Sequence, residues 1–414
     1  MPKTIATTPS WYWPDLVPRA IGIPPFSVVD YLIKRPNRSC PQSTVFVDAQ
    51  NSFSFQQVND LINKATGFLN SKRSGQTRLK LGVLLDSSAK SAILLLAAIN
   101  SNSDIYLMDE FNLSLEYSNL TNLDLVLING KDNPSQIQPA GGFLKFDELV
   151  SFETDIGTQD FKFDRDEFGR AKINLYGSFG LTSHSERSLL AAALSFSTFL
   201  EGAMVVGHTS ENTWLNLYDL SVWQGINGLL SALINSSTTY FCSDSGVAAE
   251  VIAERAPNWI LCNFNLGDEI ASKMGRKKKN NSYVQQAALL GIDGEFAPDT
   301  RRDISNSLGS ALTFYGTAET MVMLASHPSW YIDEAVGIAI PNMHIVPADP
   351  DTYEPIDTLW ELLDQAVISA WSPSLGSPVD ESGASHYKDG RFITEQLASS
   401  DPNGMLYLLD SEGY

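Results

Sequence analysis

Short apolar strand signals alternate with helix signals along most of the chain, and this alternation limits the folds that the chain can adopt. The runs STVFVDAQ and LKLGVLLD are rich in leucine and β-branched residues. Each precedes a stretch with helical spacing, SFQQVNDLINKATGFLNSK and SSAKSAILLLAAINSN. Short apolar runs indicate buried strands, whereas apolar residues spaced three and four apart indicate helices. Strands that alternate with helices predict parallel sheets joined by crossover helices, which is an α/β fold.

The middle of the chain repeats this pattern, and the C-terminal part does not. RSLLAAALSFSTFLEGA and SVWQGINGLLSALINSS predict helices, while TTYFCS, NWILCNF and QAALLGIDG predict buried strands. After about Ala335, short β-like pieces are separated by proline, aspartate and glycine. Since 414 residues exceed what one core holds, we expect a first α/β lobe over residues 1–170, a second over 171–334 and a small β subdomain over 335–414.

Composition excludes several classes of partner. Acidic residues outnumber basic ones 48 to 28. Because a net charge of -20 repels phosphate backbones and anionic lipid, we expect the protein to bind neither nucleic acid nor membranes. The cysteines Cys40, Cys242 and Cys262 lie too far apart for a disulfide framework or a zinc knuckle. The longest apolar run, residues 92–99, is too short to span a bilayer, and no signal peptide is apparent. These features predict a cytoplasmic protein.

The stretch INLYGSFGLTSHSERSLL reads as a buried strand, a loop of small residues and a helix start. Strand, loop and helix in this order are typical of a phosphate cradle, because backbone N–H groups and the helix N-terminus attract anions. This loop contains no lysine. Ser178 and Thr182 could still donate hydrogen bonds to a phosphate, and Arg187 could supply a positive charge from the helix.

Four further segments follow one another in a recognisable order: LTFYGTAET, EAVGIAIPNMHIVPADPDTYEP, WELLDQAVISAW and KDGRFITEQLASSDPNGMLYLLD. With them the chain resembles the large N-terminal part of the adenylate-forming superfamily, which contains acyl-CoA synthetases, luciferases and nonribosomal-peptide adenylation domains. The resemblance implies two packed α/β lobes with mostly parallel sheets, layered αβαβα, and a small distorted β-barrel-like subdomain. The family's mobile C-terminal domain, which carries a lysine, has no counterpart in these residues.

The resemblance also implies the nucleotide-binding residues. In the family's Y-G-x-T-E signature, the aromatic ring stacks on adenine, the threonine contacts the α-phosphate and the glutamate holds Mg²⁺; here Tyr315 and Glu319 match and Ala318 replaces the threonine. In the T-G-D element Thr394 is retained, and Gln396 replaces the aspartate that holds the ribose. The phosphate loop is shorter than the family's and lacks its P-K-G triplet. Alternatively, Tyr315 and Glu319 are structural residues of a strand–loop junction.

The segment LNLYDLSVWQGINGLLSAL resembles the F-D-x-S motif of amino-acid-activating domains, in which the aspartate pairs with the substrate's α-ammonium group. The matching residue is Asp219, and a carboxylate in an apolar pocket is costly unless a cation meets it. Alternatively, Asp219 caps a helix that begins near Ser221. By position in the resemblance, the other pocket residues are Trp223, Cys262, Gly291, Asp293, Phe314, Val322 and Met323.

These departures from the motifs predict weakened binding of ATP and Mg²⁺. The sequence therefore predicts a degenerate homologue that does not activate carboxylates alone and serves as a ligand-binding or assembly partner in amino-acid or acyl metabolism. The alternative is an active AMP-forming ligase, with a rebuilt ATP site or completed by a missing or separate C-terminal domain. Such a ligase adenylates an amino acid or other carboxylic acid for transfer to a carrier protein or coenzyme A. A third interpretation is acyl transfer or hydrolysis through a loop serine and His184, although no triad is visible.

Overall fold

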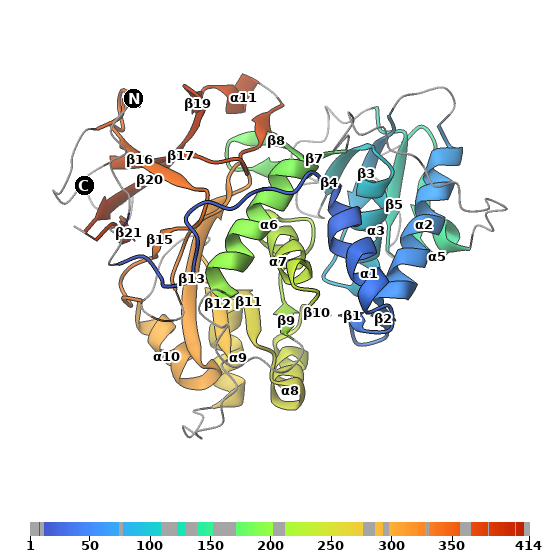
Figure 1. The fold of residues 1–414 in the computed structure, drawn as a ribbon, viewed down its shortest axis with the longest axis horizontal. Helices are drawn as coiled ribbons and strands as arrows, with labels where there is room; N and C mark the ends of the chain where they lie inside the picture. The colour runs from blue at the N-terminus through green and yellow to red at the C-terminus, as the bar shows by residue number, and fades with distance from the viewer. Residues whose placement is uncertain are drawn as a thin grey trace.

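Three β-sheets and the helices around them make up the computed structural model (Figure 1). Two sheets are large and mixed, and the third is small. The structure describes Thr8, Ser329 and residues 12–73, 78–108, 122–129, 139–151, 171–201, 212–275, 286–292, 298–327, 331–356, 366–379, 381–401 and 403–409.

The nine-stranded sheet is parallel in its centre and antiparallel at both edges. Its central strands are buried along most of their length, as expected for parallel strands covered on both faces. In order across the sheet the strands are β15 (Ile338–Ala339), β14 (Met321–Ala325), β13 (Ser310–Thr317), β12 (Ala287–Gly291), β11 (Trp259–Asn263), β9 (Thr213–Asn216), β10 (Thr238–Phe241), β1 (Thr44–Val47) and β2 (Ser52–Ser54).

The seven-stranded sheet has five parallel strands and two antiparallel strands at one edge. Its edge strand β18 comes from the C-terminal part of the chain, so this sheet joins residues that are far apart in sequence. In order the strands are β18 (Ser377–Pro378), β8 (Gly180–Ser185), β7 (Lys172–Gly177), β4 (Asp104–Met108), β3 (Lys80–Leu84), β5 (Leu125–Ile128) and β6 (Phe143–Lys145).

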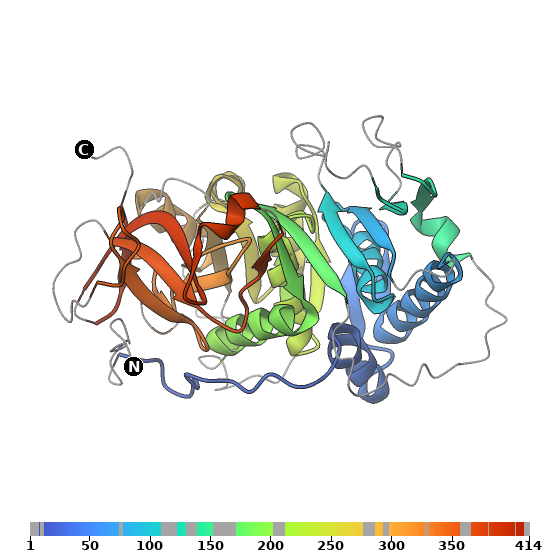
Figure 2. The ribbon, with the colours of Figure 1, turned by 90° about the horizontal axis from the view of Figure 1, so that it is seen from above.

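The small sheet is antiparallel and lies beside the β13 side of the nine-stranded sheet, in orange and red in Figure 2. Its strands are β16 (His344–Ala348), β17 (Ala366–Trp371), β20 (Arg391–Ser400) and β19 (Tyr387–Lys388), with β21 (Leu406–Leu408) also paired to β20.

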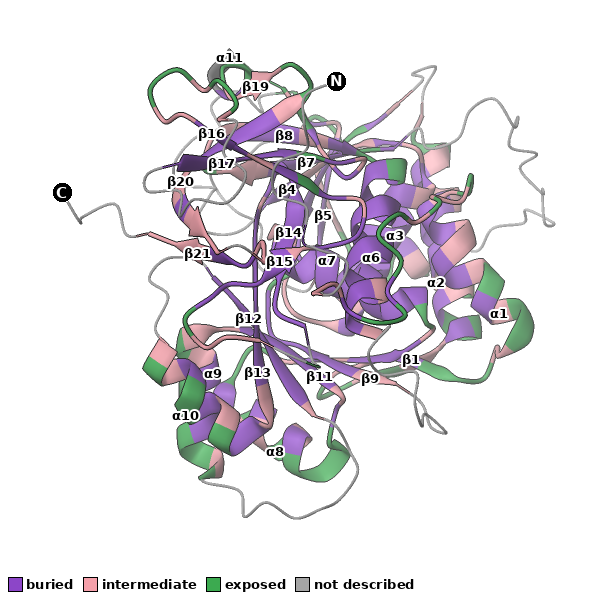
Figure 3. Ribbon diagram, turned by 60° about the vertical axis from the view of Figure 1, so that its left-hand side comes forward, coloured by how far each residue is buried: buried purple, intermediate pink, exposed green. Residues whose placement is uncertain are grey.

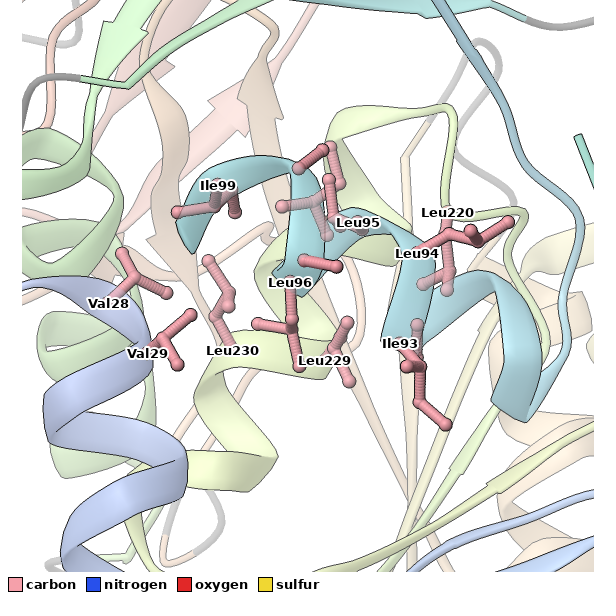
Figure 4. Close-up of a cluster of buried hydrophobic side chains, with 14 of the residues drawn as sticks. Val28, Val29, Ile93, Leu94, Leu95, Leu96, Ile99, Leu220, Leu229 and Leu230 are labelled. Carbon is pink, nitrogen blue, oxygen red and sulfur yellow. The ribbon is translucent and has the colours of Figure 1, made fainter. Parts of the chain in front are cut away.

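The helices bury apolar faces against the two large sheets. Three of them, α8, α9 and α10, cover one face of the nine-stranded sheet and expose their outer sides (Figure 3). On its other face, α3, α6 and α7 share a core with strands of both large sheets, and Figure 4 shows apolar side chains of α3 packed against α7. The helices are η1 (Asp30–Lys34), α1 (Arg35–Ser39), α2 (Phe55–Ser71), α3 (Ala89–Asn100), α5 (Phe146–Val150), α6 (Glu186–Glu201), α7 (Trp223–Ile234), α8 (Ser245–Arg255), α9 (Phe264–Met274), α10 (Pro298–Leu308) and α11 (Glu381–Ala384).

The predicted α/β class and the separate C-terminal β sheet are confirmed. The two helices predicted after the first strands are α2 and α3, and those predicted in the middle of the chain are α6 and α7. The division at residues 170 and 334 remains a prediction, and sheet membership crosses the first boundary: β1 and β2 join the second-lobe sheet, while β7 and β8 join the first-lobe sheet. In the part of the chain that the structure describes, no helix has the length and apolarity needed to cross a membrane.

The N-terminal segment runs along one side of the molecule from the small sheet to the first lobe, in blue in Figure 2. The side-chain amide of Asn342 holds this segment at one point, since it accepts from Ile21 N at 2.8 Å and donates to Ile21 O at 3.0 Å. Further along, the backbone N–H of Val28 donates to Glu186 Oε2 at 2.8 Å. Glu186 is the first residue of α6, and it is only 2% exposed.

Burial raises the pKa of Glu186 to about 7, although the N–H groups of Val28 and Ala171 and the Lys34 ammonium favour the charged form and Asp30 opposes it. Because the folded-state pKa lies above the unfolded value, the folded state binds the extra proton. Protonated Glu186 therefore stabilises the folded state below the unfolded pKa, and this stabilisation is lost as pH rises through the folded pKa. We expect the free energy of unfolding to fall by about 3 kcal/mol as pH rises from about 4.5 to about 8.

The prediction is measured by urea unfolding of Glu186→Gln and the wild type across that pH range. The variant should show a flatter pH dependence, and Glu250→Gln, which changes an exposed carboxylate, should follow the wild type. A difference between Glu186→Gln and the wild type that does not vary with pH would contradict the assignment.

Candidate functional site

The predicted phosphate loop is a tight β-hairpin. The strands β7 and β8 pair from Lys172↔Ser185 up to Gly177↔Gly180, which leaves only Ser178 and Phe179 in the turn. The expectation of strand, loop and helix was therefore wrong, because residues 180–185 form a second strand before α6 begins. Strand β8 pairs on its other side with β18, and this long-range partner is not visible in the local sequence pattern.

The hairpin separates the candidate phosphate-binding side chains. Ser178 is exposed in the turn, whereas Thr182 is buried and its hydroxyl lies 3.3 Å from Ser377 O and 3.5 Å from the Tyr387 hydroxyl. Arg187 is exposed beyond the far end of β8, about 20 Å from the turn at the rise of a β-strand. Arg187 therefore cannot neutralise a phosphate at this turn.

Glu319 lies where the three sheets meet. It follows β13, its backbone carbonyl accepts from Gly376 N at 2.8 Å, and its side chain lies against the hairpin. A Cβ atom on Gly177 would come within 2.4 Å of Glu319 Oε1, so only glycine permits this approach. The carboxylate accepts hydrogen bonds from the Phe179 backbone and the Thr317 hydroxyl.

The Glu319 carboxyl is incompletely satisfied. Its side chain is 2% exposed, and its Oε2 atom is buried without a hydrogen-bond partner among the described residues. Burial raises its pKa, and the hydrogen bonds and the nearby His386 oppose that shift. An unpartnered carboxylate oxygen is a hard ligand of the kind that Mg²⁺ prefers. No group of three or more acidic, His or Cys side chains in the described ranges could hold a metal ion, including at this site. Glu319 would therefore need substrate phosphates as co-ligands.

Tyr315 and Thr394 form the adjacent wall of the site. The Tyr315 phenol is 9% exposed and bonds to the Thr394 side chain, and the Thr394 hydroxyl in turn donates to Ile368 O at 2.9 Å. Gln396 does not extend this wall. Its amide nitrogen donates to Leu397 O and Leu409 O, both at 2.9 Å, so its donors stabilise the β20–β21 region.

Two residues that the sequence analysis missed complete this region. The His386 ring lies 4.2 Å from the Phe179 ring in the hairpin turn, and its Nδ1 lies 3.2 Å from Ile393 O. Tyr387 is held near Thr182, and burial raises its pKa to about 12, with the Glu319 charge adding to the effect. Their only sequence signal is the dipeptide HY before KDGRF, and this dipeptide says nothing about contacts with a turn more than two hundred residues earlier.

Asp219 is exposed and lies in the loop that joins β9 to α7. The alternative that it is the N-cap of a helix beginning near Ser221 was wrong, because α7 begins at Trp223 and its N-cap residue is Val222. The Asp219 backbone packs closely on the helix, since a Cβ on Gly225 would lie 2.0 Å from Asp219 O. Its role as a ligand of an ammonium group remains a prediction.

The other candidate pocket residues divide into two groups. Cys262 is fully buried in the core under α9, and burial raises the pKa of its thiol to about 12, so it belongs to the packing between sheet and helix. Asp293 lies outside the described residues. The structure brings Trp223 and Gly291 against the Phe314 ring, and Phe314, Val322 and Met323 belong to one core cluster.

His184 does not support hydrolysis. It is 0% exposed, and its Nε2 lies 2.7 Å from Ala318 O. Burial lowers the pKa of His184 to about 4, so the ring is neutral near pH 7 and donates to that carbonyl. The histidine fixes β8 against the segment that carries Glu319, and no substrate could reach it in this arrangement.

Solved structures of CoA synthetases and of a CoA ligase share this architecture, so the chain has the fold of these enzymes. The chain is similar to a long-chain-fatty-acid-CoA ligase from Archaeoglobus fulgidus, with a TM-score of 0.76 and 12% identity over 96% of this chain and 86% of that one. It is also similar to o-succinylbenzoate CoA synthetase from Bacillus subtilis in complex with ATP and magnesium ion, with a TM-score of 0.73 and 15% identity over 93% of this chain and 81% of that one. ATP-bound MatB from Rhodopseudomonas palustris has a TM-score of 0.73 and 16% identity over 93% of this chain and 78% of its own. No protein-family model matches the sequence. No curated protein matches it either.

Proposed function

We propose, from the fold that this chain shares with CoA ligases, that the protein is an AMP-forming ligase that activates a carboxylic acid. The observation that carries the proposal is the Glu319 carboxyl, which is buried between three sheets, with no hydrogen-bond partner for Oε2 among the described residues. Adjacent to it, the Tyr315–Thr394 pair supplies an ordered wall. Of the three similar structures named above, two contain ATP, and one of these also contains a magnesium ion.

In the proposed reaction the acid's carboxylate oxygen forms a bond to the α-phosphorus of ATP, and the bond to the pyrophosphate leaving group breaks. A thiol then attacks the acyl carbon and releases AMP. Glu319 would hold Mg²⁺, which supplies positive charge to the phosphates. In the hairpin turn, the backbone and the hydroxyl of the exposed Ser178 would donate hydrogen bonds to those phosphates. The acceptor thiol belongs to coenzyme A or a carrier protein, and the acid to the amino-acid or acyl class.

A second candidate is a homologue that binds an acid without activating it, alone or as a partner in an assembly. Two observations favour it. The hairpin turn consists of only two residues, Ser178 and Phe179, and neither carries a positive charge. The Gln396 amide donors, at the position of the family's ribose-binding residue, are used by backbone carbonyls.

Exchange of labelled pyrophosphate into ATP separates these functions. The ligase should catalyse an exchange that requires both Mg²⁺ and an acid, and a screen of amino, aryl and fatty acids identifies the substrate class. Thermal shifts with the same acids measure binding independently, since a ligand that binds only the folded state raises the melting temperature. Acid-induced shifts without exchange would favour the second candidate and contradict the first.

A further inference from the structure

The side chain of Tyr218 spans the carboxyl edge of the nine-stranded sheet. Tyr218 follows β9 in sequence, yet its hydroxyl lies against Gly291, the last residue of β12, and β11 separates these two strands. A Cβ on Gly291 would lie 2.2 Å from the Tyr218 hydroxyl oxygen and 2.9 Å from Phe314 Cζ. The space over Gly291 on this face of the sheet is therefore filled by two aromatic rings.

The backbone holds Tyr218 in this position. Its N–H donates to Asn216 Oδ1 at 3.1 Å, and Asn216 Nδ2 donates to Gly225 O at 3.0 Å, which ties the loop to α7. A Cβ on Gly225 would lie 3.3 Å from Tyr218 Cβ, so the loop and the first turn of α7 are in close contact. Tyr218 is 8% exposed. Its ring is a fixed part of the sheet edge.

This position adjoins the candidate nucleotide site. Phe314, which shares Gly291 with Tyr218, directly precedes Tyr315 in β13 and packs edge-on against Trp223 at 6.0 Å. Ligands of α/β proteins bind in the crevice outside the carboxyl ends of the parallel strands. An acid whose carboxylate lies near Tyr315 would meet the Tyr218 ring if its chain extended along that edge.

We propose that Tyr218 is a specificity-determining residue that stops the acid chain at Gly291 and restricts the protein to short or compact carboxylic acids. This inference rests on the proposed ligase function for its activity readout. Its basis is steric: an aromatic side chain of fixed position excludes additional methylene groups, and pocket contacts of one methylene discriminate substrates by about tenfold or more.

The test uses straight-chain fatty acids from acetate to decanoate with the wild-type chain, Tyr218→Ala and Tyr218→Leu. We measure acid-dependent pyrophosphate exchange, and we measure the melting-temperature shift that each acid produces without ATP. With the wild type, we expect short acids to support exchange and raise the melting temperature, and we expect octanoate and decanoate to do neither. In both variants the longer acids should gain at least about tenfold in exchange rate and in apparent affinity. Tyr218→Phe, which keeps the ring, should retain the wild-type length profile.

The two readouts separate the two proposals. If the length profile changes in the melting shifts but no protein catalyses exchange, the ligase function is wrong and the role of Tyr218 stands. If the wild type catalyses exchange and the length profile of folded Tyr218→Leu is unchanged, the role of Tyr218 is wrong and the ligase function stands. A wild type that uses decanoate as well as butyrate, or proteins that bind no acid at all, would also overturn the role of Tyr218.

Discussion

Glu319→Gln should reduce acid-dependent pyrophosphate exchange by at least about 100-fold, the usual cost of removing one preorganised electrostatic group. The substitution keeps the shape of the side chain, and the amide oxygen can still accept from the Phe179 N–H. It removes the charge that would hold Mg²⁺ at the buried Oε2 position. The measurement is the exchange rate at saturating Mg²⁺ and ATP.

The matched control is Glu395→Gln. The Glu395 side chain is 68% exposed and lies 4.0 Å from His386, so this change alters a carboxylate near the site without entering it. Exchange by the control should stay within about twofold of the wild type, as expected for an exposed ion pair. Because Glu319 is buried with a raised pKa, its substitution should leave the folded state at least as stable near pH 7. Undiminished exchange by Glu319→Gln would remove the carboxylate from the proposed metal site.

Arg301→Met should lower the free energy of unfolding by about 3–5 kcal/mol, because it removes five donor contacts from a buried network. The Arg301 side chain is fully buried in α10, and burial lowers its pKa to about 10. Its cation also lies 4.5 Å from the centre of the Tyr331 ring. It donates to Ala311 O, Ile332 O, Asp333 O, Ala335 O and the Ser326 hydroxyl at 2.8–3.1 Å.

The neighbouring arginine is the control for this prediction. Arg302 forms ion pairs with Asp299, Asp333 and Glu334, yet its side chain is 47% exposed. Arg302→Met should therefore cost far less stability than Arg301→Met, because exposed ion pairs contribute little. Urea unfolding at one pH compares the two variants. Equal losses of stability would show that the buried network around Arg301 contributes no more than the surface pairs do.

Local sequence patterns were sufficient to predict the main helices and strands and part of the candidate nucleotide site. Tyr315 and Glu319 stand within one short motif, so the sequence could propose both, and the structure places them beside each other at the end of β13. The hairpin could not be predicted in the same way. Strand β8 is stabilised by pairing with β18, which lies almost two hundred residues further along the chain, and the small residues of β8 have no strong strand signal of their own.

The motifs also could not predict which groups the individual side chains contact. Gln396 matches a ribose-binding position in the resemblance, but the proximity of β21 directs its amide to backbone carbonyls. Cys262 matches a pocket position, but its side chain lies in the core under α9. Successive residues of a strand point to opposite faces, so a neighbouring position would face the other side of the sheet. A shift of register by one residue would exchange these faces, and position in a motif does not report the register.

The order of apolar residues along the chain was enough to specify the α/β class, its main helices and strands, and a separate β sheet at the end, since each depends on periodicity over a few neighbouring residues. Only the tertiary structure decided that Gly177 meets Glu319, that Tyr218 reaches Gly291 and that Arg301 satisfies distant carbonyl groups. These contacts join residues from different elements, and their burial and hydrogen bonding depend on how the sheets pack.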